Sequence, residues 1–154
     1  MNKPYRMLSG IAVLGISLGL SAAAIAQDNA SKSPALSLKG HDPVAYFTEH
    51  RAVKGAAKIN YDFDDARYLF STPKNRETFA SSPDRYTPQF GGLCTTGLAM
   101  GMKTESDPNV WAIVDGKLYV FSSPQAKEMA QKDPHLIEQA QEVWKKMNPA
   151  PRRP

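Results

Sequence analysis

The sequence is almost free of cysteine: its 154 residues contain one, Cys94. A single thiol excludes an internal disulfide and the paired cysteines of a Cys-x-x-Cys zinc or redox site. Beyond the first 26 residues the chain also has no Gly-x-Ser-x-Gly nucleophile elbow, phosphate-binding loop or His-Glu-x-x-His helix. No motif therefore supports hydrolase or nucleotide chemistry.

The chain also has little net charge. Nineteen Lys and Arg against fifteen Asp and Glu give +4. The first 26 residues carry one Lys, one Arg and no acid, so the remainder has a net charge of +2. The basic residues are dispersed, whereas nucleic-acid-binding proteins gather them into a patch. We expect no nucleic-acid partner.

Long apolar runs are absent except at the start of the chain. The apolar segment 11–26 has 16 residues, against the roughly 20 that a membrane-spanning helix needs. Lys3 and Arg6 precede it, and it ends in Ala24–Ile25–Ala26, which is typical of a secretory signal peptide. The sequence predicts cleavage after Ala26, no stable membrane insertion afterwards, and a periplasmic or secreted protein.

The remaining chain is expected to form one domain of the α+β class. Residues 27–35 are polar and predict a flexible segment, and the proline-rich residues 148–154 predict a disordered tail. Between them, residues 36–147 show no internal repeat and no long linker, which favours one hydrophobic core.

Alternation and turn residues predict two β-hairpins. One pairs 59–63 with 68–70, and the other pairs 110–114 with 117–121 across the Asp115–Gly116 turn. We expect the hairpins to form an antiparallel sheet. Short helices should begin after the caps Asp42 and Thr72, each followed by proline. A C-terminal helix pair, 124–132 and 135–146, should pack across the sheet through the apolar stripe of its second member.

Four glycines surround the thiol in the segment 86–102. The Gly91–Gly92 pair permits positive φ and close contact. A helix beginning near Leu93 places Cys94 in its first turn, where the helix dipole favours a thiolate. A buried, inert thiol is the competing interpretation, since free cysteine is often buried.

Two methionines, Met100 and Met102, follow the thiol, and thiolate with thioether suits Cu(I). If 93–102 is one helix, Met102 lies about 12 Å along the axis from Cys94 and Met100 faces elsewhere, so neither shares an ion with it. If the segment is irregular, this objection lapses. Otherwise the two side chains are expected to fill the core. His41 is a candidate ligand or base for Cys94, or a residue that caps its turn.

The motifs 40–47, 68–70, 75–79 and 83–86 resemble those of the YHS domain family. The stretch Phe90–Gly91–Gly92–Leu93–Cys94 and the hairpin from Trp111 to Tyr119 are similar to its exported, single-domain bacterial branch. The resemblance implies a small metal-handling module. Three cysteines of the family's metal-binding members fall on Ala45, Ser71 and Asn75, so the resemblance implies a site rebuilt around Cys94, with His41.

These observations predict a small exported binding protein rather than an enzyme. It is expected to hold a copper or zinc ion, or a metal-bearing small ligand, through Cys94 and His41. The pocket is expected to be lined by Tyr46, Phe90, Gly91, Gly92 and Trp111. Two alternatives stay open. One is a thiol-based redox protein or enzyme with Cys94 as its reactive thiol, and the other is a structural module that docks a protein partner or a second copy.

Overall fold

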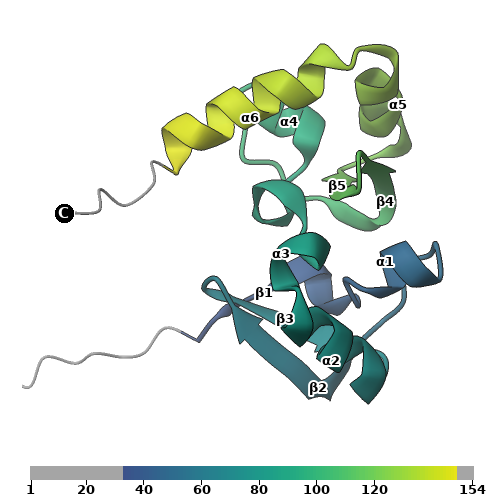
Figure 1. Cartoon of the computed structure of the whole chain (residues 1–154). Coiled ribbons are helices and arrows are strands. Elements are labelled where there is room, and N and C mark those ends of the chain that lie inside the picture. Colours follow the sequence, from purple (N-terminus) through teal and green to yellow (C-terminus); the bar gives the residue numbers. More distant parts are fainter. Residues whose placement is uncertain (1–32, 149–154) are drawn as a thin grey trace, which may run out of the picture. The chain divides into compact units, whose positions relative to one another are not determined.

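The computed structural model describes residues 33–148, which form six α-helices, two short 3₁₀ turns and five strands (Figure 1). The first elements are β1 (Ala35–Leu36), η1 (Ser37–Gly40), α1 (Ala45–Thr48), β2 (Ala56–Phe63), β3 (Ala66–Phe70), α2 (Pro73–Ser81) and α3 (Pro83–Tyr86). They are followed by η2 (Gln89–Gly92), α4 (Thr95–Ala99), β4 (Asp107–Val114), β5 (Lys117–Phe121), α5 (Pro124–Lys132) and α6 (His135–Met147). The α+β class is confirmed.

The strands form two small sheets. In the first, the order is β1-β3-β2, with β1 parallel to β3 and β2 antiparallel to it. The second consists of the β4-β5 hairpin. Both predicted hairpins are confirmed, but each belongs to its own sheet rather than to a shared one.

An internal repeat organises residues 33–148. The element order η, α, β, β, α, α occurs in residues 37–86 (repeat 1) and again in residues 89–147 (repeat 2). The β2-β3 and β4-β5 pairings correspond residue by residue: Ala56 pairs with Phe70, and Asp107 with Phe121, 51 positions later. Both ladders then carry an irregularity at the same place. The interpretation that the domain lacks an internal repeat is wrong.

Short sequence matches accompany the structural repeat. Phe70–Ser71–Thr72–Pro73 ends β3 and starts α2, and Phe121–Ser122–Ser123–Pro124 does the same for β5 and α5. In both, the hydroxyl before the proline accepts the backbone N–H three residues on, which caps the helix. The repeat is thus built from the same strand-to-helix connection used twice.

The core is divided into three clusters. One lies within repeat 1 around Phe79, and one within repeat 2 around Leu98 and Phe121. The third joins the repeats, with Leu38 and Tyr46 from repeat 1 packed beside Leu118 and Val120 from repeat 2. The single core expected from the sequence is therefore three smaller clusters, and the third joins the two repeats.

The apolar stripe of α6 packs on the core as predicted, with Ala140 buried and the other members partly buried, but α4 is its main partner rather than the sheet. Among residues 33–148, no helix has both the length and the apolar character needed to cross a membrane. The predicted signal peptide 1–26, most of the predicted flexible segment and residues 149–154 of the tail lie outside the described residues.

Candidate functional site

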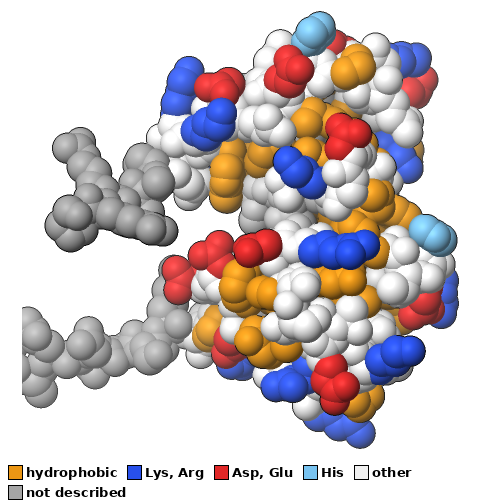
Figure 2. Space-filling model, viewed as in Figure 1, with side chains coloured by type: hydrophobic (Ala, Val, Ile, Leu, Met, Phe, Trp, Pro, Cys, Tyr) orange, Lys and Arg blue, Asp and Glu red, His pale blue; other side chains and the backbone are white. Residues whose placement is uncertain are grey.

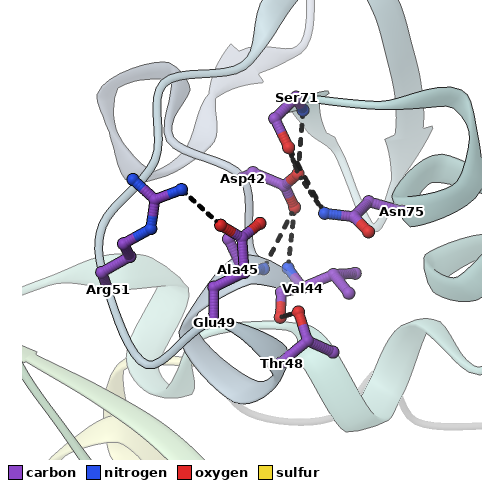
Figure 3. Close-up of polar contacts among 8 residues, drawn as sticks. All are labelled: Asp42, Val44, Ala45, Thr48, Glu49, Arg51, Ser71 and Asn75. Carbon is purple, nitrogen blue, oxygen red and sulfur yellow. Dashed lines mark hydrogen bonds and ion pairs between the residues drawn. The ribbon is translucent and has the colours of Figure 1, made fainter.

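The carboxylate of Asp42 is completely buried in repeat 1 and accepts hydrogen bonds from three directions (Figure 3). Its Oδ1 accepts the backbone N–H groups of Val44, at 2.9 Å, and Ala45, at 3.4 Å, at the start of α1, where Val44 rather than the predicted Asp42 is the N-cap residue. Its Oδ2 accepts the Ser71 N–H at 2.8 Å, the Ser71 hydroxyl at 2.7 Å and the Asn75 amide at 2.7 Å. We call these five residues the Asp42 centre.

The Asp42 centre gathers the three positions to which the resemblance assigns the cysteines of the family's metal-binding members. Ala45, Ser71 and Asn75 all contact the same carboxylate (Figure 3). Five donors already occupy its two oxygens, and every buried side-chain polar atom among the described residues has a partner. This centre therefore holds its elements together through hydrogen bonds.

Cys94 occupies the same place in repeat 2 that Asp42 occupies in repeat 1. The Asp42 N–H donates to the Val53 carbonyl at 2.8 Å, and the Cys94 N–H donates to the Thr104 carbonyl at 2.9 Å. The Cys94 sulfur accepts the Gly97 N–H at 3.4 Å, and its thiol donates to the Ser122 hydroxyl at 3.3 Å. Gly97 and Ser122 are the counterparts of Ala45 and Ser71. Cys94 is the N-cap residue of α4, which begins at Thr95, two positions after Leu93, where the helix was expected to begin.

Cys94 differs from Asp42 because it is one of the residues that line an open hollow of about 250 Å³. We call this space the Cys94 hollow. Cys94 is 1% exposed and also belongs to the buried core cluster of repeat 2. The hollow is lined by Cys94, Thr96, Gly97, Met100, Met102, Thr104, Ser122, Ser123, Gln125, Ala126 and Met129.

Met100 and Met102 are 53% and 51% exposed, so the prediction that they fill the core is wrong. The reason is that α4 ends at Ala99 and Gly101 then adopts a φ of +78°, which turns the chain. The single helix over 93–102 that separated these side chains from Cys94 does not form.

His41 lies in a different hollow. Its ring is 8% exposed, and its Nδ1 is 2.9 Å from the Leu38 carbonyl oxygen, which fixes the ring at the end of η1. It lines a space of about 500 Å³ together with Lys39, Lys54, Glu105, Ser106, Asp107, Pro108, Asn109 and Ser122. Ser122 borders both hollows, but His41 does not line the Cys94 hollow. Within residues 33–148, no three His, Cys, Asp or Glu side chains are grouped to hold a metal ion.

The residues expected to line one pocket with Cys94 are distributed over separate places. The Tyr46 and Trp111 rings meet edge to face at 5.2 Å, and the Tyr46 hydroxyl donates to the Pro108 carbonyl at 2.9 Å. Burial, followed by Asp107 and Asp42, raises the pKa of Tyr46 above its usual value. Phe90 belongs instead to the repeat 2 core, and Gly91 and Gly92 make the positive-φ turn before Cys94. The prediction of one pocket is therefore corrected.

Two residues that line the Cys94 hollow, Ser122 and Met129, were not predicted from the sequence. The signal for Ser122 was the recurrence of Phe-Ser-Ser/Thr-Pro, which makes it the counterpart of Ser71. Met129 had no local signal, because its place in the lining of the Cys94 hollow depends on how α5 packs against α4.

Charged side chains of both signs are intermixed on the face seen in Figure 2, in line with the dispersed charge of the sequence.

Comparison of the chain with protein-family models, with curated proteins and with solved structures finds no match.

Proposed function

We propose that this chain is a small exported metal-binding protein of the YHS type, which binds a copper or zinc ion at Cys94. The observation that carries the proposal is the place of Cys94, a buried thiol, in the lining of an open hollow. The equivalent place in repeat 1 holds a carboxylate whose oxygens are already occupied. Repeat 2 therefore has a sulfur ligand at the position where the oxygen atoms of repeat 1 are already engaged in hydrogen bonds.

The side chains around the thiol favour binding of a small ion. Ala126 stands where repeat 1 has Asn75, so no amide fills the space beside the sulfur. Ser122 accepts the thiol proton in a hydrogen bond, which orients the sulfur. Thiolates bind soft and borderline metals, and the thiol proton leaves to solvent when the metal binds. Affinity for the ion should accordingly increase with pH.

The test is an anaerobic titration of the purified full-length chain with Cu(I) and Zn(II) against a competing chelator. We expect tight binding of one ion, lost in Cys94→Ser and kept in His41→Gln, which alters the other hollow. Loss of metal binding in both variants would support Cys94 and His41 as the pair of ligands, as the sequence predicts. No binding by the unaltered protein would overturn the proposal.

The two alternatives are distinguished by different measurements. A thiol enzyme needs a base near Cys94, but His41 lines another hollow and the thiol is 1% exposed. We therefore expect alkylation of Cys94 to be slower than that of a free thiol, and rapid alkylation would favour the enzyme. If Cys94→Ala changes only stability, by about 1–3 kcal/mol, the structural module would be favoured.

A further inference from the structure

Methionine is concentrated around the Cys94 hollow. Residues 33–148 contain four methionines, and three of them, Met100, Met102 and Met129, line this one space. Their side chains are 53%, 51% and 44% exposed, and they are three of the five large hydrophobic side chains that stand out as exposed in the described part of the chain. A core-filling role does not account for thioethers left in solvent around a buried thiol.

Two separate segments bring these side chains to the hollow. Met100 is the C-cap residue of α4, and in the turn that follows the Met102 N–H donates back to the Gly97 carbonyl at 2.9 Å, which returns the chain toward the start of the helix. Met129 comes from α5, which is tied to α4 by the Thr96 hydroxyl donating to the Ala126 carbonyl at 2.7 Å. The backbone on each side of the hollow is thus fixed by hydrogen bonds.

Three positions that carry sulfur-containing side chains in repeat 2 carry oxygen-containing side chains in repeat 1. Where repeat 2 has Cys94, Met100 and Met129, repeat 1 has Asp42, Thr48 and Thr78. The two threonine hydroxyls donate to carbonyls of their own helices, to Val44 at 3.1 Å and to Lys74 at 2.9 Å. In repeat 1 the oxygen atoms at these positions make hydrogen bonds within the repeat. In repeat 2 the corresponding residues line the Cys94 hollow.

We propose that the Cys94 hollow is a site for a monovalent soft ion, Cu(I) or Ag(I), held by the Cys94 thiolate and by thioethers of Met100, Met102 and Met129. This inference rests on the proposed function and specifies its metal and its ligands. Thiolate and thioether donors select Cu(I), whereas Zn²⁺ is bound by thiolate, imidazole and carboxylate. The described lining of the hollow contains no imidazole or carboxylate.

Charge balance favours the same ion. Binding releases the Cys94 proton to solvent, so one thiolate and one monovalent cation leave the site neutral. A divalent ion with the same ligands leaves one uncompensated positive charge next to a buried residue, which is costly. The expected order of affinity is therefore Cu(I) and Ag(I) well above Zn(II).

The experiment uses the full-length chain labelled with ¹³C at its methionine methyl groups. Ag(I), which does not change oxidation state in the assay, is added while the methyl resonances are followed by NMR. We expect the resonances of Met100, Met102 and Met129 to shift until one equivalent is bound. The resonance of Met147 should stay in place, because that side chain packs on the repeat 2 core and does not line the hollow.

Affinity measurements complete the test, with Cu(I) under anaerobic competition with bicinchoninate. The triple variant M100L/M102L/M129L is compared with the matched control M147L, after circular dichroism has shown that both are folded. We expect the triple variant to lose about a hundredfold in affinity, because changes even in the outer shell of a metal site cost 10–100-fold. The control should retain the affinity of the unaltered protein.

The outcomes separate the two proposals. If an ion binds through Cys94 but the triple variant binds as tightly as M147L, the methionine ligands are refuted and the proposed function stands. If Zn(II) binds as tightly as Cu(I), the assignment to monovalent ions is wrong. If no ion binds to the unaltered protein, both proposals fail.

Discussion

Replacing Asp42 by asparagine tests how far repeat 1 depends on its buried carboxylate. The two side chains have nearly the same shape, so the variant changes hydrogen bonding with little change in packing. One carboxylate oxygen becomes an NH₂ group. Wherever that group is placed, it faces N–H or O–H donors, since all five partners of Asp42 donate (Figure 3).

The magnitude follows from the number of bonds lost. If the amide oxygen keeps the three donors from Ser71 and Asn75, the N–H groups of Val44 and Ala45 lose their acceptor. A hydrogen bond to a charged group contributes about 1.5–3 kcal/mol, and an unsatisfied buried donor costs about 1–3 kcal/mol. We expect Asp42→Asn to lower the free energy of unfolding by about 3–5 kcal/mol, a large share of the 5–15 kcal/mol typical of a domain. At about 3–4 °C per kcal/mol, Tm should fall by roughly 10–20 °C.

The assay is urea unfolding followed by circular dichroism, with Asp62→Asn as the matched control. Asp62 pairs with Arg67 at 2.7 Å on the surface, and both side chains are more than 40% exposed. A surface ion pair contributes about 0–1 kcal/mol, so the control should be close to the unaltered protein. If Asp42→Asn is no more destabilising than Asp62→Asn, the view that this carboxylate holds repeat 1 together is refuted.

Three further predictions concern the room for a side chain at Gly55 and the pKa values of His135 and Tyr46. Gly55→Ala should destabilise by about 1–3 kcal/mol or more in thermal unfolding, because its Cβ would lie 2.4 Å from the Leu69 carbonyl carbon. A cost below about 0.5 kcal/mol would contradict this. The Glu138 carboxylate raises the pKa of His135, chiefly through a hydrogen bond, so the interaction stabilises below the ordinary histidine pKa and is lost as pH rises through the raised value. NMR titration should show this pKa falling in Glu138→Gln, and an unchanged pKa would refute the assignment. Burial raises the pKa of Tyr46, so Tyr46→Phe should leave the ultraviolet titration of tyrosine near pH 10 unaltered, and a reduced amplitude there would show that Tyr46 ionises normally.

Local features of the fold could be predicted because their causes are local. The Asp115–Gly116 turn, with both residues at positive φ, closes the β4-β5 hairpin as expected. Thr72 caps α2 through its hydroxyl, and α5 and α6 begin at the residues predicted. Each of these depends on neighbours within a few positions, where residue type and backbone conformation are directly linked.

The internal repeat could not be recognised in the same way. The two ladders share their register and their irregularity, yet Asn60 and Tyr61 of one correspond to Trp111 and Ala112 of the other. A strand pairing is made by backbone groups, which all residues except proline supply, so the side chains can differ while the pairing stays the same. The recurrent Tyr-x-Phe-Ser-Ser/Thr-Pro is a short trace of the repeat in the sequence.

Local residue patterns were sufficient to predict the hairpins, the cap at Thr72 and the place of Cys94 at the start of a helix. The tertiary structure decided which side chains share a site. Asp42 accepts hydrogen bonds from Ser71 and Asn75, which lie 29 and 33 positions away, and Met129 of α5 lines the same hollow as Cys94. The same structure places His41 in another hollow. The physical reason is that ligands are gathered by packing between distant segments, and the spacing of residues along a chain carries no record of that packing.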